Sequence, residues 1–306
     1  MPTAHWIWML ESESNLAPRK LLEAIPWDIE WLFRASPLFE GADALQYLMR
    51  RYGASVGFSG SPELGRTPWR PIPVVGRYFE HIVHAGLSSL KGLRNIHRNI
   101  IVREGGRTLG EIDFLMTFDD GLMIQVECCY KCYLSYPDSS SPGKWTFIGP
   151  DPRDSLERKR RRMMTVQLPL RSPRHPSCDL ALPLARGVLF YHPTHPASIG
   201  LPVGAHPEHE RGTWVRVSEL DSLDSPSLCW QWALHPKPYW LHYPATLGDA
   251  GAWMTFENAA CHIRSLMQQG NPLCLASRRP VATDLPCHRM ERVMVVGDQW
   301  PMLQAP

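Results

Sequence analysis

The sequence predicts an α/β protein with a mixed central sheet flanked by helices, preceded by a helical region and followed by a C-terminal elaboration. Three observations lead to this fold class. An apolar stripe with helical spacing runs from Arg77 to Leu90. Three strand-like segments, separated by glycine-containing turns, follow between Asn99 and Leu134. A helical segment, Asp154 to Leu168, and a strand-like segment, Gly187 to Tyr191, continue the alternation.

Length and composition are those of a folded protein. The chain has 306 residues, 44% of them hydrophobic and 20% charged, and a net charge of +2, so any nucleic-acid surface must come from local clustering of basic residues. No apolar run approaches the roughly 20 residues needed to cross a bilayer. The patch Trp6–Leu10 has no preceding basic region, so it does not predict a signal peptide. We therefore expect a cytoplasmic protein with no membrane segment and with reduced cysteines.

Residues 1–73 are expected to form an N-terminal helical region. Apolar residues at spacings of three and four between Leu21 and Phe33 predict a packed helix. A second helix, Ala44 to Arg51, should end where Gly53 can adopt the left-handed cap conformation. The segment from Ser59 to Pro73 holds four prolines and two glycines, which is typical of a connector.

Residues 74–191 are expected to form the core. After the helix from Arg77, the pattern predicts a meander of antiparallel strands at Asn99–Arg103, Thr108–Phe118 and Leu122–Leu134. The proline- and serine-rich stretch Pro137–Pro152 indicates a loop. The next helix has Asp154 or Ser155 as its N-cap and ends before Pro169.

Residues 192–306 are expected to form an elaboration packed on the same core. Histidine and proline are dense between His192 and Glu210, which obscures any periodicity there. Further on, Trp253–Gln269 is typical of a helix, and Leu273–Ala276 and Arg292–Val296 are typical of strands.

The meander carries the most informative polar residues. Side chains alternate along a strand, so Glu111 shares a face with Asp113, and Glu127 shares a face with Lys131. A three-residue turn at Asp119–Gly121 would place Asp113 directly opposite Glu127. A two-residue turn would instead shift the register and separate the two carboxylates across the sheet. Three-residue turns with a left-handed glycine are common.

Two carboxylates that face each other repel unless a cation lies between them. Oxygen ligands with room for water suit Mg²⁺ or Mn²⁺, so the sequence predicts that Asp113 and Glu127 are the metal ligands. Lys131 would orient water or neutralise charge on a phosphate. The alternative is an exposed hairpin face with solvated acids and a cross-strand ion pair at Lys131, because short motifs match by chance.

Three further features favour a functional site. Glu80 lies beside the apolar stripe of the helix that precedes the meander, where it can point toward the sheet. The basic run Arg158–Arg162 and the later Gln167 lie on the helix that follows. The order is also informative: a helix with an acid, a strand, a strand with Asp113, a strand with an acid and a lysine, and a helix.

This order resembles the PD-(D/E)XK phosphodiesterase superfamily, the fold of restriction endonucleases and RecB-like nucleases. The resemblance implies a restriction-endonuclease-like sheet and assigns catalytic positions to Glu80, Asp113, Glu127 and Lys131. Gln167 falls where some members carry a glutamine. The resemblance also implies DNA or RNA as partner, and the residues expected to hold it are Arg158, Lys159, Arg162 and Gln167.

More closely, the chain resembles an uncharacterised bacterial family known as domain of unknown function 1853. The matching stretches include Gly76–Glu80, Gly110–Leu115, Glu127–Leu134 and Gly149–Asp151. Its name implies no activity. The expected function is therefore metal-dependent hydrolysis of phosphodiester bonds, and the alternative is an inactive nuclease fold that binds nucleic acid or protein.

Two departures from the superfamily pattern keep that alternative open. The usual Glu-x-Lys spacing is Glu127-x-x-x-Lys131 in this chain, which moves the ammonium along an ideal strand by roughly 13 Å instead of roughly 7 Å. A bulge at Cys128–Cys129 would bring it back. In addition, no proline precedes Asp113 at the position in the superfamily's name.

Other residues favour competing sites less strongly. Cys129 and Cys132 form a CxxC, but no second pair completes a zinc site, and an extended strand would point them to opposite faces. The loop histidines are more typical of a protein surface; they include His175, His192, His195, His206 and His209. The twelve tryptophans are explained by core packing and loop anchoring rather than by base stacking.

Overall fold

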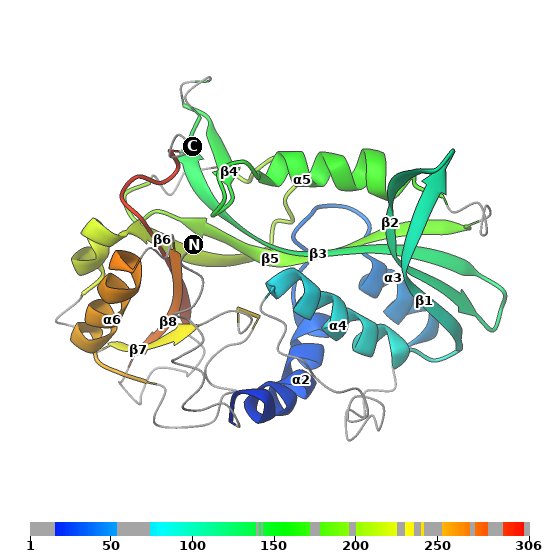
Figure 1. Cartoon of the computed structure of the whole chain (residues 1–306), viewed down its shortest axis with the longest axis horizontal. Helices are drawn as coiled ribbons and strands as arrows, with labels where there is room; N and C mark the ends of the chain where they lie inside the picture. Colours follow the sequence, from blue (N-terminus) through cyan, green and yellow to red (C-terminus); the bar gives the residue numbers. More distant parts are fainter. Residues whose placement is uncertain are drawn as a thin grey trace.

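A computed structural model gives the fold of this chain (Figure 1). It describes residues 16–53, 74–138, 141, 143–171, 178–195, 200–224, 230–235, 240–241, 253–269, 273–280 and 290–302. The predicted connector Ser59–Pro73 and the predicted surface residue His175 lie outside these ranges. Of the other histidines predicted to lie at the surface, His192 and His209 are buried, because each packs beside an aromatic ring.

A mixed sheet runs through the described part of the chain, in the order β1-β2-β3-β5-β6-β9-β8-β7, and β4 pairs with β3 outside this path. The middle strands β3, β5, β6 and β9 are parallel, whereas the pairs at both ends are antiparallel. The strands are β1 (Leu93–Glu104), β2 (Arg107–Phe118), β3 (Met123–Pro137), β4 (Trp145–Ile148), β5 (Leu180–Tyr191), β6 (Glu210–Arg216), β7 (Trp230–His235), β8 (Leu273–Pro280) and β9 (Glu291–Val296). The predicted mixed sheet flanked by helices is confirmed.

Three helices cover one face of the β2–β3–β5 part of the sheet: α2 (Leu16–Arg34), α3 (Ala44–Tyr52) and α4 (Val75–Ser88). The even-numbered residues of β3 from Ile124 to Leu134 pack against these helices in one core. Caps fix the ends of α3, since Asp43 accepts from the Gln46 N–H at 3.1 Å and Gly53 has a positive φ of 69°. The predicted end of this helix is confirmed.

Helix α5 (Leu156–Arg162) and the π-helical turn η1 (Met163–Gln167) cover the opposite face of β3 (Figure 1). Ser155 is the N-cap, accepting from the Arg158 N–H at 3.3 Å. The Leu168 N–H donates to Met163 O at 2.9 Å, which is the i to i+5 bond of a π turn. The helix predicted over Asp154–Leu168 therefore changes its winding halfway.

Strands β6 and β9 extend the sheet beyond β5, and β8 and β7 end it. Helix α6 (Phe256–Gln268) and the 3₁₀ turn η2 (Val217–Leu223) pack on this part in a separate apolar core. The predicted helix and the two predicted strands after residue 250 match α6, β8 and β9.

Three elements differ from expectation. The stretch Pro137–Pro152 was expected to be a loop, but β4 lies within it and pairs with β3 at Leu134–Pro137. Strands β6 and β7 were not predicted, because both are short, lie in or near proline-rich segments and lack a clear alternation. Among the described helices, none has the length and apolar character required to cross a membrane.

Candidate functional site

The site begins at the turn between β2 and β3. Phe118 N donates to Leu122 O at 3.0 Å, and Gly121 has a positive φ of 84°. The turn therefore has three residues, and β2 pairs with β3 from Thr117–Met123 to Phe114–Val126. This is the predicted register. One further step of the same register would place Asp113 opposite Glu127, but the ladder ends before that step.

The strands β2 and β3 separate at this step. Strand β5 occupies one edge of β3, so β2 and β4 share the other, where β2 pairing ends at Val126 and β4 pairing begins at Leu134. The Asp113 carboxylate fills the place of the missing ladder bond, because its Oδ2 accepts from the Cys128 N–H at 2.8 Å. The two acids thus lie where the sheet opens between two strands.

Glu127 is fully buried and is held by two amides. Gln125 Nε2 donates to Oε1 at 3.1 Å, and Gln167 Nε2 donates to Oε2 at 3.2 Å. Gln167 in turn accepts from Lys159 Nζ at 3.0 Å through its Oε1. The helix α5 and its π turn therefore deliver an amide and an ammonium to the acid site from the sheet face that they cover.

The carboxylates influence one another. Burial raises the pKa of Glu127 to about 8, and the charge of Asp113 adds to the rise. Burial also raises the pKa of Asp113, whereas the Cys128 N–H and the charge of Lys159 lower it. Lys159 lowers the pKa of Glu127 as well. A cation beside both acids would relieve this repulsion.

Glu80 approaches from helix α4. It is half-buried, and its pKa is raised by burial and then by the charges of Asp113 and Glu111. The sequence therefore identified an acid that shares the electrostatic field of the hairpin. Its charge also contributes to raising the pKa of the buried Cys128 thiol.

Lys131 has a different partner from the one expected at a catalytic centre. Its Nζ lies 2.6 Å from Oδ2 of Asp154, and both side chains are about one-third exposed. Asp154 immediately precedes the N-cap of α5, so this ion pair ties the start of that helix to β3. Gly187 lies opposite Lys131 on β5, where an added Cβ would be 1.9 Å from Lys131 O, so this close approach requires glycine.

The basic residues of α5 divide between the surface and the site. Arg158 and Arg162 are exposed, and Arg158 Nη1 donates to the backbone oxygen of Arg153 at 2.9 Å. Lys159 and Gln167 turn inward to Glu127. The structure thus brings together Asp113, Glu127, Lys159 and Gln167, with Glu80 in their electrostatic range, and it holds Lys131 at Asp154.

Two residues beside Asp113, Asn99 and Glu111, have contacts that the sequence did not predict. Asn99 lies across from Asp113 on β1 and has a φ of 55°, a left-handed conformation that asparagine tolerates. Its Nδ2 donates to Oε1 of the exposed Glu111 at 2.7 Å. Strand alternation within Gly110–Asp113 indicates that Glu111 lies near Asp113, whereas no local sequence pattern indicates that Asn99 does.

The competing cysteine site is not formed. Cys129 and Cys132 pack in different apolar cores on the two faces of the sheet, as strand alternation predicted. Within the described ranges, no three His, Cys, Asp or Glu side chains are arranged to hold a metal ion. Asp113 and Glu127 are the carboxylates of the acid site whose oxygens have the chemistry of Mg²⁺ ligands.

A family model described as a domain of unknown function (DUF1853) matches residues 70–296. This range contains every residue of the acid site. No curated protein and no solved structure shows a significant match to the chain.

Proposed function

The chain belongs to the family described as a domain of unknown function (DUF1853), and we propose that it is a metal-dependent nuclease that hydrolyses phosphodiester bonds of DNA or RNA. The observation that carries the proposal is the pair Asp113 and Glu127 at the opening between β2 and β3. Each acid has a raised pKa, and Asp113 contributes to the rise at Glu127. The PD-(D/E)XK resemblance of the sequence is the reason for proposing nuclease chemistry at this pair.

The residues fit Mg²⁺ or Mn²⁺ by their chemistry. Each carboxylate oxygen has two lone pairs, so the amide bonds to Glu127 leave acceptor capacity on both of its oxygens. A divalent ion bound there would supply charge stabilisation for a phosphate and lower the pKa of a bound water. Asp113 and Glu127 would hold it, and Glu80 would act directly or through a water.

Lys159 would supply the cation that faces the phosphate. Its charge lowers the pKa of both Asp113 and Glu127, and its Nζ is fixed by Gln167. Lys131, the lysine that the sequence pattern favoured, would act on the site through Asp154 and the position of α5. Electrostatic stabilisation of the phosphate therefore comes from the helix rather than from the strand.

Exposed arginines near the site fit a polyanionic substrate. Arg158 and Arg162 lie on α5, and Arg98 and Arg103 lie on β1 near the strand that carries Asp113. The charge of Arg98 reaches Glu80, whose pKa it lowers. Contacts of this kind bind the backbone of nucleic acid independently of sequence.

The test is cleavage of labelled DNA and RNA with Mg²⁺ or Mn²⁺. We expect Asp113→Asn and Lys159→Met each to lower the cleavage rate by at least about a hundredfold. Asp221→Asn is the matched control, because this exposed carboxylate lies in η2 and pairs with Arg264. Cleavage that survives both changes would show that the nuclease activity does not reside at this site.

The second candidate is a nucleic-acid or protein interaction module without turnover. It is favoured by the complete burial of Glu127 and by the engagement of Lys131 with Asp154. In that case, wild-type protein would bind nucleic acid but cleave neither substrate. The double change Arg158→Ala and Arg162→Ala should then reduce the slope of log affinity against log salt by about 2.

A further inference from the structure

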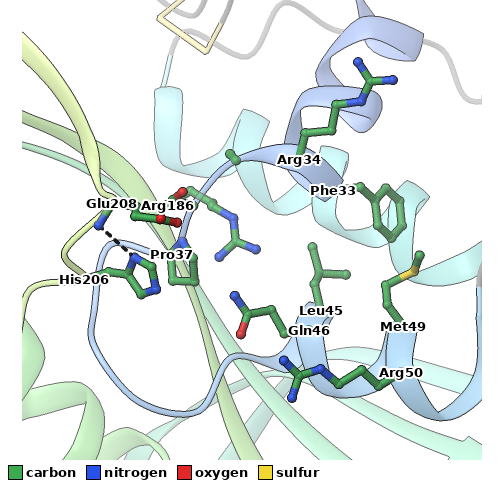
Figure 2. Close-up of a pocket in the computed structure, with 12 residues that line it drawn as sticks. Phe33, Arg34, Pro37, Leu45, Gln46, Met49, Arg50, Arg186, His206 and Glu208 are labelled. Carbon is green, nitrogen blue, oxygen red and sulfur yellow. Dashed lines mark hydrogen bonds between the residues drawn. The ribbon is translucent and has the colours of Figure 1, made fainter.

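A cavity of about 480 Å³ lies on the other side of the sheet from α5. It is bounded by the end of α2, the linker that follows, α3, β5 and the loop before β6 (Figure 2). Arg186 belongs to the face of β5 that also carries Leu184 and Val188, which pack in the core shared with α2, α3 and α4. This cavity is therefore separate from the acid site.

The linker between α2 and α3 holds the cavity in shape. Leu38 N donates to Ala185 O at 2.9 Å, on β5, and His206 N donates to Leu38 O at 3.0 Å. Glu40 N donates to Gly204 O at 2.9 Å. The linker thus adds backbone hydrogen bonds between β5 and the loop before β6, and the cavity is formed by backbone that is fixed on both sides. A pre-formed cavity of this size is typical of a small-molecule site.

Arg186 is a buried cation with spare hydrogen-bonding capacity. Its side chain is 2% exposed, and its two terminal nitrogens donate to Asp43 at 2.7 and 3.2 Å. Its Nε has no hydrogen-bond partner among the described residues. A buried donor that lacks an acceptor is unfavourable. This nitrogen is closed to solvent, so a ligand would meet Arg186 through the charge of its guanidinium in the cavity wall.

Arg50 and Gln46 add free polar groups at the mouth. Both are exposed, and within the described part of the chain Arg50 makes no ion pair. The neighbouring Arg51 differs, because it is bonded to Asp120 at 2.7 Å. Figure 2 shows the guanidinium groups of Arg186 and Arg50 on two sides of the Gln46 amide, with Arg34 pointing away. Opposite them lie apolar side chains, namely Phe33, Leu45 and Met49.

We propose that this cavity binds a small organic anion, with its phosphate or carboxylate head between Arg50, Gln46 and Arg186 and its apolar body against Phe33, Leu45 and Met49. Guanidinium groups recognise both head groups through paired N–H donors. Because the cavity joins α2, α3 and β5, the ligand would also tie the N-terminal helices to the sheet.

The test is calorimetric titration of the whole chain with adenosine 5′-monophosphate, 1-naphthoate, adenosine and inorganic phosphate at fixed salt. We expect one or both of the organic anions to bind at least tenfold more tightly than adenosine, which lacks the head, and than inorganic phosphate, which lacks the body. The tighter of the two anions identifies the head group. The nuclease-site variant Asp113→Asn should bind equally well, which separates this proposal from the proposed activity.

Two variants locate the ligand without disturbing the buried ion pair. Arg50→Gln and Gln46→Leu should each weaken binding by roughly tenfold, the effect of losing a charged or polar contact. Arg51→Gln is the matched control on the same helix, and it should change affinity less than twofold. Absence of binding by both organic anions, or an equal loss in Arg50→Gln and Arg51→Gln, would overturn the proposal.

Discussion

The two faces of β3 are both buried, but different interactions hold them. The even-numbered side chains, such as Val126 and Leu134, meet the apolar surfaces of α2 and α4. The odd-numbered face includes Gln125, Glu127 and Ser135, each of them fully buried. An apolar face needs only matching shape, whereas each polar group on the other face needs a specific partner. Burying the polar side chains of this face is therefore energetically unfavourable unless they are paired, and buried groups with perturbed pKa values are concentrated at functional sites.

The largest expected effect is on the apolar face. Phe114 is 2% exposed, pairs with Val126 and lies beside Asp113 in sequence. We expect Phe114→Ala to lower the free energy of unfolding by about 3–5 kcal/mol, because it leaves a cavity in the core. Urea denaturation measures the change. The exposed Val166 provides the control, and Val166→Ala should change stability by less than about 0.5 kcal/mol.

On the polar face, a substitution at Glu127 is expected to raise the free energy of unfolding instead of lowering it. The pKa of Glu127 rises from 4.5 to about 8, chiefly through burial. Between these values the folded protein holds a proton that the unfolded chain releases, so the contribution of Glu127 to stability is largest below pH 4.5 and is lost as the pH rises through 8. Glu127→Gln should remove this loss and raise the unfolding free energy at pH 8.5 on the order of 2 kcal/mol.

Denaturation of wild type and Glu127→Gln at pH 5 and pH 8.5 measures this difference. The gain should be small at pH 5 and large at pH 8.5, while Asp221→Asn should show no such dependence, because that carboxylate is exposed. A variant that is less stable than wild type at both pH values would show that the two amide bonds to Glu127 outweigh its burial.

The apolar face was easier to predict than the polar one for a physical reason. Strand alternation and a short turn depend on neighbours in sequence, so the register that pairs Phe114 with Val126 could be derived from the turn Asp119–Gly121. The Lys131–Asp154 pair joins residues 23 apart and depends on where α5 begins. The Gln167 contact depends on a π turn that breaks the regular helical period.

A bound divalent ion should raise the free energy of unfolding by less than the Glu127→Gln substitution does. An ion that binds the folded chain alone should stabilise it by about 1.4 kcal/mol at ten times its dissociation constant. We expect Mg²⁺ or Mn²⁺ to raise the unfolding temperature of wild type at pH 8.5 and to leave Asp113→Asn unchanged. Because the ligands must be deprotonated, the rise should shrink at pH 5. An equal rise in Asp113→Asn would show that the ion binds elsewhere.

The smallest stability effect is expected at Lys131. Both side chains of its ion pair with Asp154 are about one-third exposed, so Lys131→Met should lower the free energy of unfolding by about 1 kcal/mol or less.

The cleavage rate tests the role of Lys131 more directly than stability does. If Lys131 acts through the position of α5, Lys131→Arg should retain most of the cleavage rate by keeping the pair. Lys159→Met should lower the cleavage rate by at least about a hundredfold, since it removes the ammonium that lowers the pKa of both acids. The bulge considered at Cys128–Cys129 is not formed, because β3 pairs with β5 without a register shift from Ile124 to Leu134. A loss in Lys131→Met as large as that in Lys159→Met, without rescue by arginine, would instead place Lys131 at the reacting phosphate.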